Sequence, residues 1–383
     1  MIESRRQGRS PPDGMTAANW RTHPHAPWAF ANVERFLPTA RVRKGRAARA
    51  LASGEPLASV DFVDASGVAR TLGAFLRDTH ADGFIVLHRG ATVYERYAAA
   101  TAAVSRHLCF SVTKAVTGLV AELLIRQGRL SEDAEAGGLV PELASSGFAD
   151  ARLRDLLDMR DGVAFDEDYA DPGAQIHRYS RHFWGAGEGG VATALALLET
   201  PRSAGAPFAY RTPVTDVVGL MVERALGASL PDLAGGLWSG IGAANDARWV
   251  EDTGGRAIAS AGLACTLRDL ARLGLAVAEA ARGAGSPEWR SAAASIMAGG
   301  DRAAFAAADQ PTRPGWSYRS GWWIDHDAGA ANALGVFGQR LHVAPDDEVV
   351  VARFGSHPVA SNQGTDLDHA RVFAAIRAAL RGA

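Results

Sequence analysis

The sequence predicts an α/β protein in which an antiparallel sheet is flanked by helices and a mostly helical domain is inserted into the chain. Strand-like alternation occurs near both ends of the 383 residues, whereas apolar residues recur at helical spacing in the middle. Strands at both ends with helices between them indicate one α/β domain that the insertion interrupts. We therefore expect a disordered leader at 1–14, a discontinuous α/β domain at 15–110 plus 251–383, and a helical domain at 111–250.

The first part of the α/β domain is predicted to contain two hairpins joined by a short helix. The run "VDFVDASGVART" turns at 65–67, and "GFIVLHRGATVYERYA" turns near 89–90. The segment "TLGAFLRDTHA" between them fits the helix, and the aromatic residues of 15–50 indicate an arm packed on the main body. The leader before this arm is polar, so Met15 is an alternative translation start.

Helical patterns dominate from Ser111 onward. Apolar residues recur at helical spacing until Gln127-Gly128, and later helices are expected in "RLRDLLDM", "VATALALLET" and "VTDVVGLMVERALG". An unusually long loop is expected from Phe165 to Gly190, and its aromatic residues favour a functional role.

The C-terminal part returns to strands. After a helix in "TLRDLARLGLAVAEA", the runs "WSYRSGWWIDHD", "NALGVFGQRLHVAP" and "DEVVVARFGS" are predicted to form three sequential antiparallel strands. A closing helix is expected in "DLDHARVFAAIRAAL".

Composition narrows the classes of function and location. The 40 basic and 42 acidic side chains give a formal net charge of -2, so no global attraction to nucleic acid or acidic membranes is expected. No run has transmembrane length, and no secretory signal is visible. Cys109 and Cys265 lie in apolar surroundings and are expected to be buried free thiols, which fits a reducing, cytoplasmic location. The spacing of the cysteines and histidines predicts no metal site.

Lysine is nearly absent, and one of its two copies occupies a distinctive position. Only Lys44 and Lys114 are lysine, and Lys114 follows Ser111 by three residues at the expected start of a helix. The two side chains then share one helix face, near the exposed N–H groups and the positive end of the dipole. A neutral, partly desolvated lysine can accept the proton of a serine, which arginine cannot do. The pair therefore indicates acyl transfer, although so short a pattern also occurs without function.

The surrounding sequence resembles the serine β-lactamase and penicillin-binding protein superfamily. Within it, the chain is similar to the class C-like branch of 6-aminohexanoate-dimer hydrolases and related esterases, from about Met15 to the C-terminus. The resemblance rests on "CFSVTKAVTGLVAELLIRQGRL", "LVPELASSGFADARLRDLLDMRDGVAFDEDY", "MTAANW", "APFAYRTPVTDVVGLMVER", "GLACTLRDLARLG" and "GVFGQRLHVAP". It implies a nucleophilic Ser111, a basic Lys114 and no cofactor.

The second motif of that family, a tyrosine followed two residues later by Asn or Ser, falls on Tyr210. The resemblance implies that its hydroxyl moves a proton between the serine oxygen and the leaving group. Thr212 departs from the family residue but keeps a hydroxyl, and we assign it to substrate binding. Without the resemblance, Tyr210 would be interpreted as a half-buried packing residue.

The third motif, Lys-Thr-Gly in β-lactamases, corresponds here to Ala333-Leu334-Gly335 followed by Val336. The missing lysine disfavours β-lactams, unless Arg340 or Arg319 replaces its charge. The resemblance implies an oxyanion hole formed by the backbone N–H groups of Ser111 and Val336, with Gly335 beside the substrate; Gly335 could equally mark a strand bulge.

Tyr169 and Trp184 of the long loop are further substrate-binding candidates, because the resembling hydrolases carry aromatic residues over the cleft. They could instead only fix the loop to the body. Four nearby glycines could form a hinge: Gly185, Gly187, Gly189 and Gly190. Three of them also match G-x-G-x-x-G, but no strand precedes them, so dinucleotide binding is not expected.

The first hypothesis is a serine hydrolase that cleaves small linear amides or short-chain esters through an acyl-enzyme on Ser111. The alternatives are a β-lactamase or D-Ala-D-Ala carboxypeptidase, and a non-catalytic binding or sensing protein of the same fold. The expected partner is a small-molecule substrate, without nucleic acid or membrane. The oligomeric state is open, a homodimer included.

Overall fold

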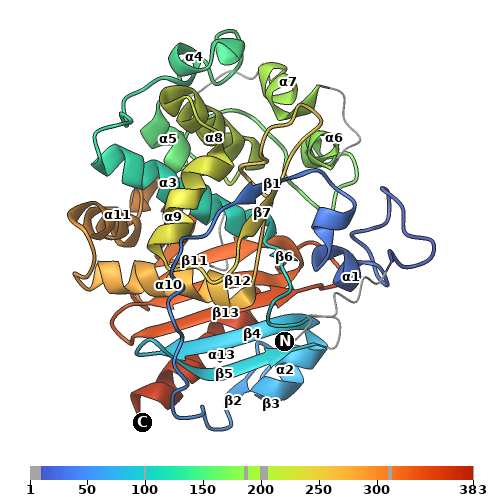
Figure 1. Ribbon diagram of the computed structural model, residues 1–383, viewed down its shortest axis with the longest axis vertical. Coiled ribbons are helices and arrows are strands. Elements are labelled where there is room, and N and C mark those ends of the chain that lie inside the picture. Colours follow the sequence, from blue (N-terminus) through green and yellow to red (C-terminus); the bar gives the residue numbers. More distant parts are fainter. Residues whose placement is uncertain (1–9, 99–100, 185–188, 199–205, 309–312, 383) are drawn as a thin grey trace.

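A seven-stranded antiparallel sheet forms the centre of the molecule, with strand order β5-β4-β13-β12-β11-β10-β9 (Figure 1). The computed structural model describes residues 10–98, 101–184, 189–198, 206–308 and 313–382. The strands of this sheet are β4 (Ala81–His88), β5 (Ala91–Tyr97), β9 (Trp316–Arg319), β10 (Trp322–Asp325), β11 (Ala330–Gly335), β12 (Gln339–Ala344) and β13 (Val349–Gly355).

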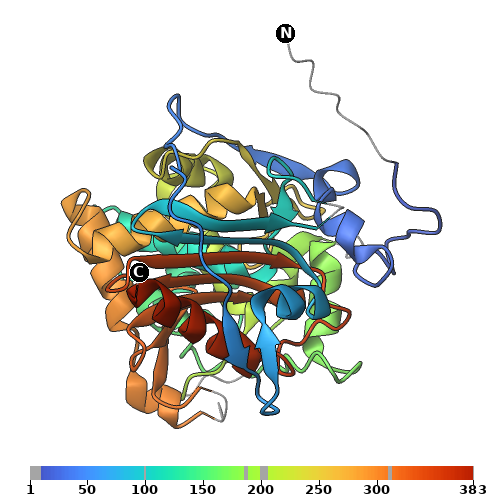
Figure 2. The ribbon, with the colours of Figure 1, turned by 90° about the horizontal axis from the view of Figure 1, so that it is seen from below.

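Helices cover both faces of this sheet, as the alternation of its side chains requires (Figure 2). The side chain of Val350 faces helix α10 (Leu267–Ala281), whose Gly274 lies directly against it. The neighbours Val349 and Val351 point to the opposite face, where they join the core of α2 (Leu72–Asp78) and α13 (Asp366–Arg381). Alternate residues of one strand therefore belong to two different hydrophobic cores.

A smaller sheet has the order β1-β7-β8-β6, and a third pairs β2 with β3. The strands are β1 (Thr39–Val42), β2 (Asp61–Val63), β3 (Ala69–Thr71), β6 (His107–Leu108), β7 (Ala247–Val250) and β8 (Leu263–Cys265). Strand β6 ends at Leu108, three residues before Ser111, and its partner β8 follows the helical region. The smaller sheet thus connects the N-terminal arm, the segment before Ser111 and the return from the helices.

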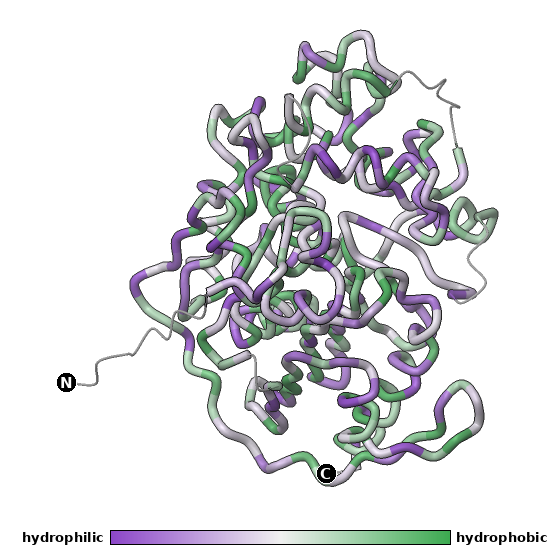
Figure 3. Tube along the Cα trace, turned by 90° about the vertical axis from the view of Figure 1, so that its right-hand side faces the viewer, coloured by the Kyte–Doolittle hydropathy of each residue, from purple (hydrophilic) through white to green (hydrophobic). Residues whose placement is uncertain are grey.

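Most remaining helices gather above the large sheet in Figure 1. They are α3 (Thr113–Arg126), α4 (Ala136–Leu139), α5 (Leu153–Leu157), α6 (Gln175–Phe183), α7 (Gly190–Ala196), α8 (Thr212–Leu226), α9 (Leu230–Gly240), α11 (Pro287–Ala298) and α12 (Arg302–Ala306), with α1 (Ala26–Phe30) in the arm. None of the described helices is long and apolar enough to cross a membrane. Hydrophobic and hydrophilic residues are interspersed along the traced chain (Figure 3).

Helix α3 crosses the middle of the molecule in direct contact with the β9–β10 turn. A Cβ atom on Gly118 would lie 1.9 Å from the carbonyl oxygen of Ser320, and one on Gly321 would lie 2.3 Å from the carbonyl carbon of Lys114. Because both contacts are with backbone, glycine is required on each side. This close packing fixes the helix that carries Lys114 against the sheet.

The structure confirms the predicted fold class, both hairpins and the helices expected around α2, α3, α5, α7, α8, α10 and α13. The division into domains stays a prediction, and residues 1–9 of the expected leader lie outside the described residues. Strand β7 lies within the segment predicted to be helical.

Two expectations for secondary structure were wrong. The three predicted C-terminal strands are five, because Ser320-Gly321 and Phe337-Gly338 adopt positive φ and turn the chain inside two of the runs. The predicted long loop contains α6, whose Ile176, Tyr179 and Phe183 are buried. Polar and basic residues between these three hid the helical period.

Candidate active site

Ser111 lies where a strand, a tight turn and a long helix meet. It is the middle residue of a single 3-10 turn, Phe110–Val112, which leads directly into α3. Phe110 has a φ of 46°, a left-handed conformation that is uncommon outside glycine and recurs at functional sites. The Ser111 side chain borders a cavity of about 260 Å³.

Lys114 lies one helical turn after Ser111 and points toward it. Its Nζ donates hydrogen bonds to Ser111 Oγ at 2.8 Å, to Thr212 Oγ1 at 3.2 Å and to the carbonyl oxygen of Ser260 at 3.2 Å. Lys114 is 1 % exposed, so these three oxygen atoms replace water around the amine. The geometry permits direct proton transfer between the lysine and the serine hydroxyl.

Tyr210 is brought next to this pair by the chain that enters α8. Its ring centroid lies 5.0 Å from Lys114 Nζ. The ring stacks on Trp323 at 5.4 Å and meets the edge of Tyr318 at 6.1 Å, so packing fixes its plane. Of the predicted trio, the serine and the tyrosine thus both lie against Lys114.

A partly buried glutamate also contacts this group, and sequence reasoning missed it. Glu167 accepts hydrogen bonds from Thr212 Oγ1 at 2.6 Å and from the Thr212 backbone N–H. The Tyr169 hydroxyl donates to the same carboxylate at 3.4 Å. Burial raises the pKa of Glu167, while the charge of Lys114 and the hydrogen bonds from Thr212 act in the opposite direction. In the sequence, Glu167 is one of several acidic residues in "FDEDY" and carries no signal of its own.

A second buried carboxyl group positions the backbone acceptor of Lys114. Asp216 accepts hydrogen bonds at 2.9 Å from the Ser260 backbone N–H, the Ser260 hydroxyl and the Tyr179 hydroxyl. Burial raises the pKa of Asp216 to about 7, although these donors and Lys114 favour its ionised form. Asp216 lies one turn into α8 after Thr212, a spacing that could have indicated it. Ser260 carries no comparable sequence signal.

The end of β11 forms the opposite wall of the site. A Cβ atom on Gly335 would lie 2.8 Å from the carbonyl oxygen of Cys109 and 3.2 Å from the backbone nitrogen of Ser111. Only glycine therefore allows β11 to approach the serine this closely. Val336 follows it and borders the cavity beside Phe337.

Neither arginine suggested as a replacement for the missing lysine reaches the cavity. Arg319 forms ion pairs with Glu122 at 2.8 Å and with Glu132 at 2.6 Å, next to the distal half of α3. Arg340 pairs with Asp366 at the start of α13. Another arginine does border the cavity: Arg21 of the N-terminal arm is among its described lining residues. Sequence reasoning did not identify Arg21 as a site residue.

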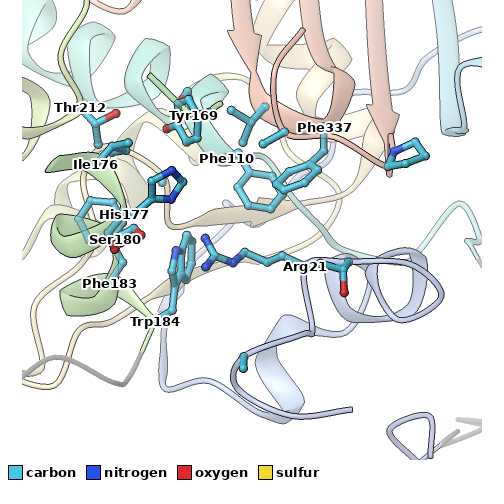
Figure 4. A pocket seen from close by; sticks show the side chains of 17 residues that line it. Arg21, Phe110, Tyr169, Ile176, His177, Ser180, Phe183, Trp184, Thr212 and Phe337 are labelled. Carbon is cyan, nitrogen blue, oxygen red and sulfur yellow. Dashed lines mark hydrogen bonds between the residues drawn. The ribbon is translucent and has the colours of Figure 1, made fainter. Parts of the chain in front are cut away.

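Tyr169 and Trp184, the two aromatic candidates for substrate binding, both line the cavity (Figure 4). Trp184 is 6 % exposed and packs edge-on against Phe110 at 6.1 Å. Gly185 and Gly187 of the expected hinge lie outside the described residues. Within the described ranges, no group of three or more His, Cys, Asp or Glu side chains could hold a metal ion.

A serine hydroxyl hydrogen-bonded to a buried lysine, at a helix start and beside the antiparallel sheet, defines a serine hydrolase of the β-lactamase type. A sequence model of the family described as Beta-lactamase matches residues 68–375. The chain belongs to this family, and it is an enzyme that cleaves amide or ester bonds.

Two comparisons place it within the family, and a third shows the same fold. The chain is 32% identical over 354 residues to a 6-aminohexanoate-dimer hydrolase from Paenarthrobacter ureafaciens, covering 90% of this chain and 88% of that protein. A solved structure described as a 6-aminohexanoate-dimer hydrolase from Bacillus anthracis has a TM-score of 0.85 at 25% identity and covers 98% of this chain and 99% of that one. A class C β-lactamase from Rhodobacter sphaeroides shares the fold, with a TM-score of 0.55 at 15% identity over 79% of this chain and 96% of the other.

The buried Asp216 makes stability depend on pH. Its folded-state pKa of about 7 lies above the ordinary aspartate value of about 3.9, so the folded protein holds a proton that the unfolded chain releases. The free energy of unfolding should therefore fall as the pH rises from about 4 to about 7. In Asp216→Asn, the decrease in the free energy of unfolding over this pH range should be smaller by a few kcal/mol, since each pKa unit corresponds to about 1.4 kcal/mol. Urea denaturation at several pH values measures the effect, and parallel profiles for the two proteins would contradict it.

Proposed function

We propose that the protein hydrolyses short linear amides, and carboxylic esters of similar size, through an acyl-enzyme on Ser111. The observation that carries this proposal is the 2.8 Å hydrogen bond between Lys114 Nζ and Ser111 Oγ beside the cavity. The relative from Paenarthrobacter ureafaciens, a 6-aminohexanoate-dimer hydrolase by name, supports a linear amide as the substrate class.

Acylation begins when Lys114 Nζ accepts the Ser111 proton and Oγ attacks the carbonyl carbon. The backbone N–H groups of Ser111 and Val336 stabilise the oxyanion, because Gly335 lets β11 approach the serine. Tyr210 donates its hydroxyl proton to the leaving nitrogen or oxygen as the bond to the carbonyl carbon breaks. The proton held by Lys114 then restores the tyrosine hydroxyl.

Deacylation repeats the same steps with water as the nucleophile. Water attacks the acyl carbon and loses a proton to the basic site formed by Tyr210 and Lys114. The bond between the carbonyl carbon and Oγ breaks, Ser111 recovers its proton, and the acid leaves. Thr212 keeps Lys114 in place through its 3.2 Å hydrogen bond. No step requires a cofactor.

Ala333 argues against the β-lactamase and D-Ala-D-Ala carboxypeptidase alternatives. It lies on β11 at the position where those enzymes carry a lysine, and its side chain is apolar and fully buried. The non-catalytic alternative is disfavoured because serine, lysine and tyrosine are all present, and Lys114 contacts both the Ser111 hydroxyl and the Tyr210 ring. The proposed partner is a small molecule, without nucleic acid.

We also propose a cytoplasmic location. Cys109 and Cys265 are buried free thiols with their sulfur atoms 3.5 Å apart. A reducing compartment would preserve them in this state.

Replacing either member of the central pair should abolish hydrolysis. Ser111→Ala removes the nucleophile, and Lys114→Arg leaves a side chain that cannot accept the serine proton, so kcat should fall by about a thousandfold or more in each. The assays are release of p-nitrophenol from p-nitrophenyl acetate and release of amine from the linear dimer of 6-aminohexanoate. Lys44→Arg, at the other lysine, and the surface variant Ser131→Ala are the matched controls. Full activity in Lys114→Arg would contradict the proposed base.

The role of Tyr210 predicts a difference between amides and activated esters. An amine must be protonated as it leaves, whereas p-nitrophenolate leaves without a proton. Tyr210→Phe should therefore lower kcat for the amide by about a hundredfold or more, and for p-nitrophenyl acetate much less. Tyr318→Phe, which alters the neighbouring ring that packs against Tyr210, is the control. Equal losses on both substrates would contradict the proton transfer.

A further inference from the structure

Among the described residues, the cavity is bordered by a positively charged side chain and by no negatively charged one. Of the described residues that border it, none is Asp or Glu, and Arg21 contributes a guanidinium group. Arg21 forms no ion pair or hydrogen bond with any residue that the structure describes. Glu167, the carboxylate near the catalytic group, instead accepts hydrogen bonds from Thr212 and Tyr169.

Arg21 is held in place by aromatic rings rather than by an acid. Its guanidinium carbon lies 5.5 Å from the Trp20 ring centroid and 5.9 Å from that of Trp184. The two indoles meet edge-on at 5.3 Å, and Trp20 is 2 % exposed, so they form a fixed support. Figure 4 shows the Arg21 side chain reaching from the arm toward Trp184, with its nitrogen atoms in the cavity.

Among the described residues, no carboxylate compensates the charge of Arg21. Burial lowers the pKa of the Arg21 guanidinium, which reflects the cost of desolvating a cation. Aromatic faces orient a guanidinium but leave its N–H donors available. A planar fork of donors in this state matches a carboxylate, which it can bind through two parallel hydrogen bonds.

We propose that Arg21 binds a free carboxylate of the substrate, and that the enzyme selects linear amides and esters carrying a negative charge away from the scissile bond. This inference rests on the proposed function, because it places that charge in the cavity beside Ser111. The cation comes from the N-terminal arm, whereas the strand position of the missing lysine holds the buried Ala333. Arg21 is the charged contact that the described lining offers to such a substrate.

The test compares matched linear amides that differ only in one terminal group. N-hexanoyl-6-aminohexanoate and its primary carboxamide place the group on the leaving amine. Adipic acid monohexylamide and its carboxamide place it on the acyl part, and N-hexyl-6-aminohexanamide supplies an ammonium instead. Products are quantified by liquid chromatography with mass spectrometry, and kcat/KM is determined for each substrate.

The wild-type enzyme should prefer the carboxylate over the carboxamide by about tenfold to a hundredfold in at least one pair, as expected for a charge-assisted hydrogen bond. Arg21→Gln should reduce this ratio to about twofold or less, and Arg21→Lys should retain part of it. The matched control is Arg178→Gln, which removes an exposed arginine on the neighbouring α6 and should keep the wild-type ratio. Arg21→Gln should not lower kcat/KM for the ammonium substrate, because that substrate has no carboxylate for Arg21 to bind.

A second readout needs only the wild-type protein, in case Arg21→Gln fails to fold. The preference for the carboxylate should decrease as the salt concentration rises, because mobile ions screen a partly exposed ion pair. Absence of a preference in both pairs, or a ratio unchanged in Arg21→Gln, would overturn the assignment. Wild-type hydrolysis of p-nitrophenyl acetate that is lost in Ser111→Ala would show in the same experiment that the proposed function stands while the role of Arg21 fails.

Discussion

The contact between the Lys114 amine and the Ser111 hydroxyl is the constraint around which the rest of the site is arranged. An amine that is 1 % exposed needs polar partners to replace water, and Ser111, Thr212 and Ser260 provide them. Two of these partners have support of their own, because Glu167 fixes Thr212 and Asp216 fixes Ser260. The helix that carries Lys114 lies against the β9–β10 turn, where Gly118 and Gly321 permit backbone contact.

The cavity beside this contact is assembled from segments that are far apart in the chain. The arm contributes Arg21, the region of α6 contributes Trp184, and the end of β11 contributes Val336. The small sheet makes this convergence possible, since β6 pairs with β8 just before Ser111. In the mechanism and the substrate selectivity that we propose, catalysis and selectivity come from different parts of the sequence. The buried pair supplies the chemistry, and the arm supplies the charge that a substrate meets.

Many of the secondary-structure elements and the central pair of the site could be predicted from the sequence. The predictions that failed did so for physical reasons. The scarcity of lysine singled out Lys114, and hairpin turns and helical spacing gave most of the elements correctly. The strands around Ser320 and Phe337 were merged, because non-glycine residues with positive φ leave no pattern. Glu167 and Arg21 were missed because their roles arise only from tertiary contacts. The missing lysine at Ala333 was the available hint, since it implied that any cation would have to come from another segment.

The most direct test of the central claim is the detection of the covalent intermediate. The enzyme is mixed with p-nitrophenyl acetate, quenched in acid within the first turnovers, and digested for peptide mass spectrometry. The account predicts one acetyl group on the peptide that contains Ser111, localised to that serine by fragmentation. Continued turnover with no acyl group on Ser111, or with the label on another side chain, would contradict it.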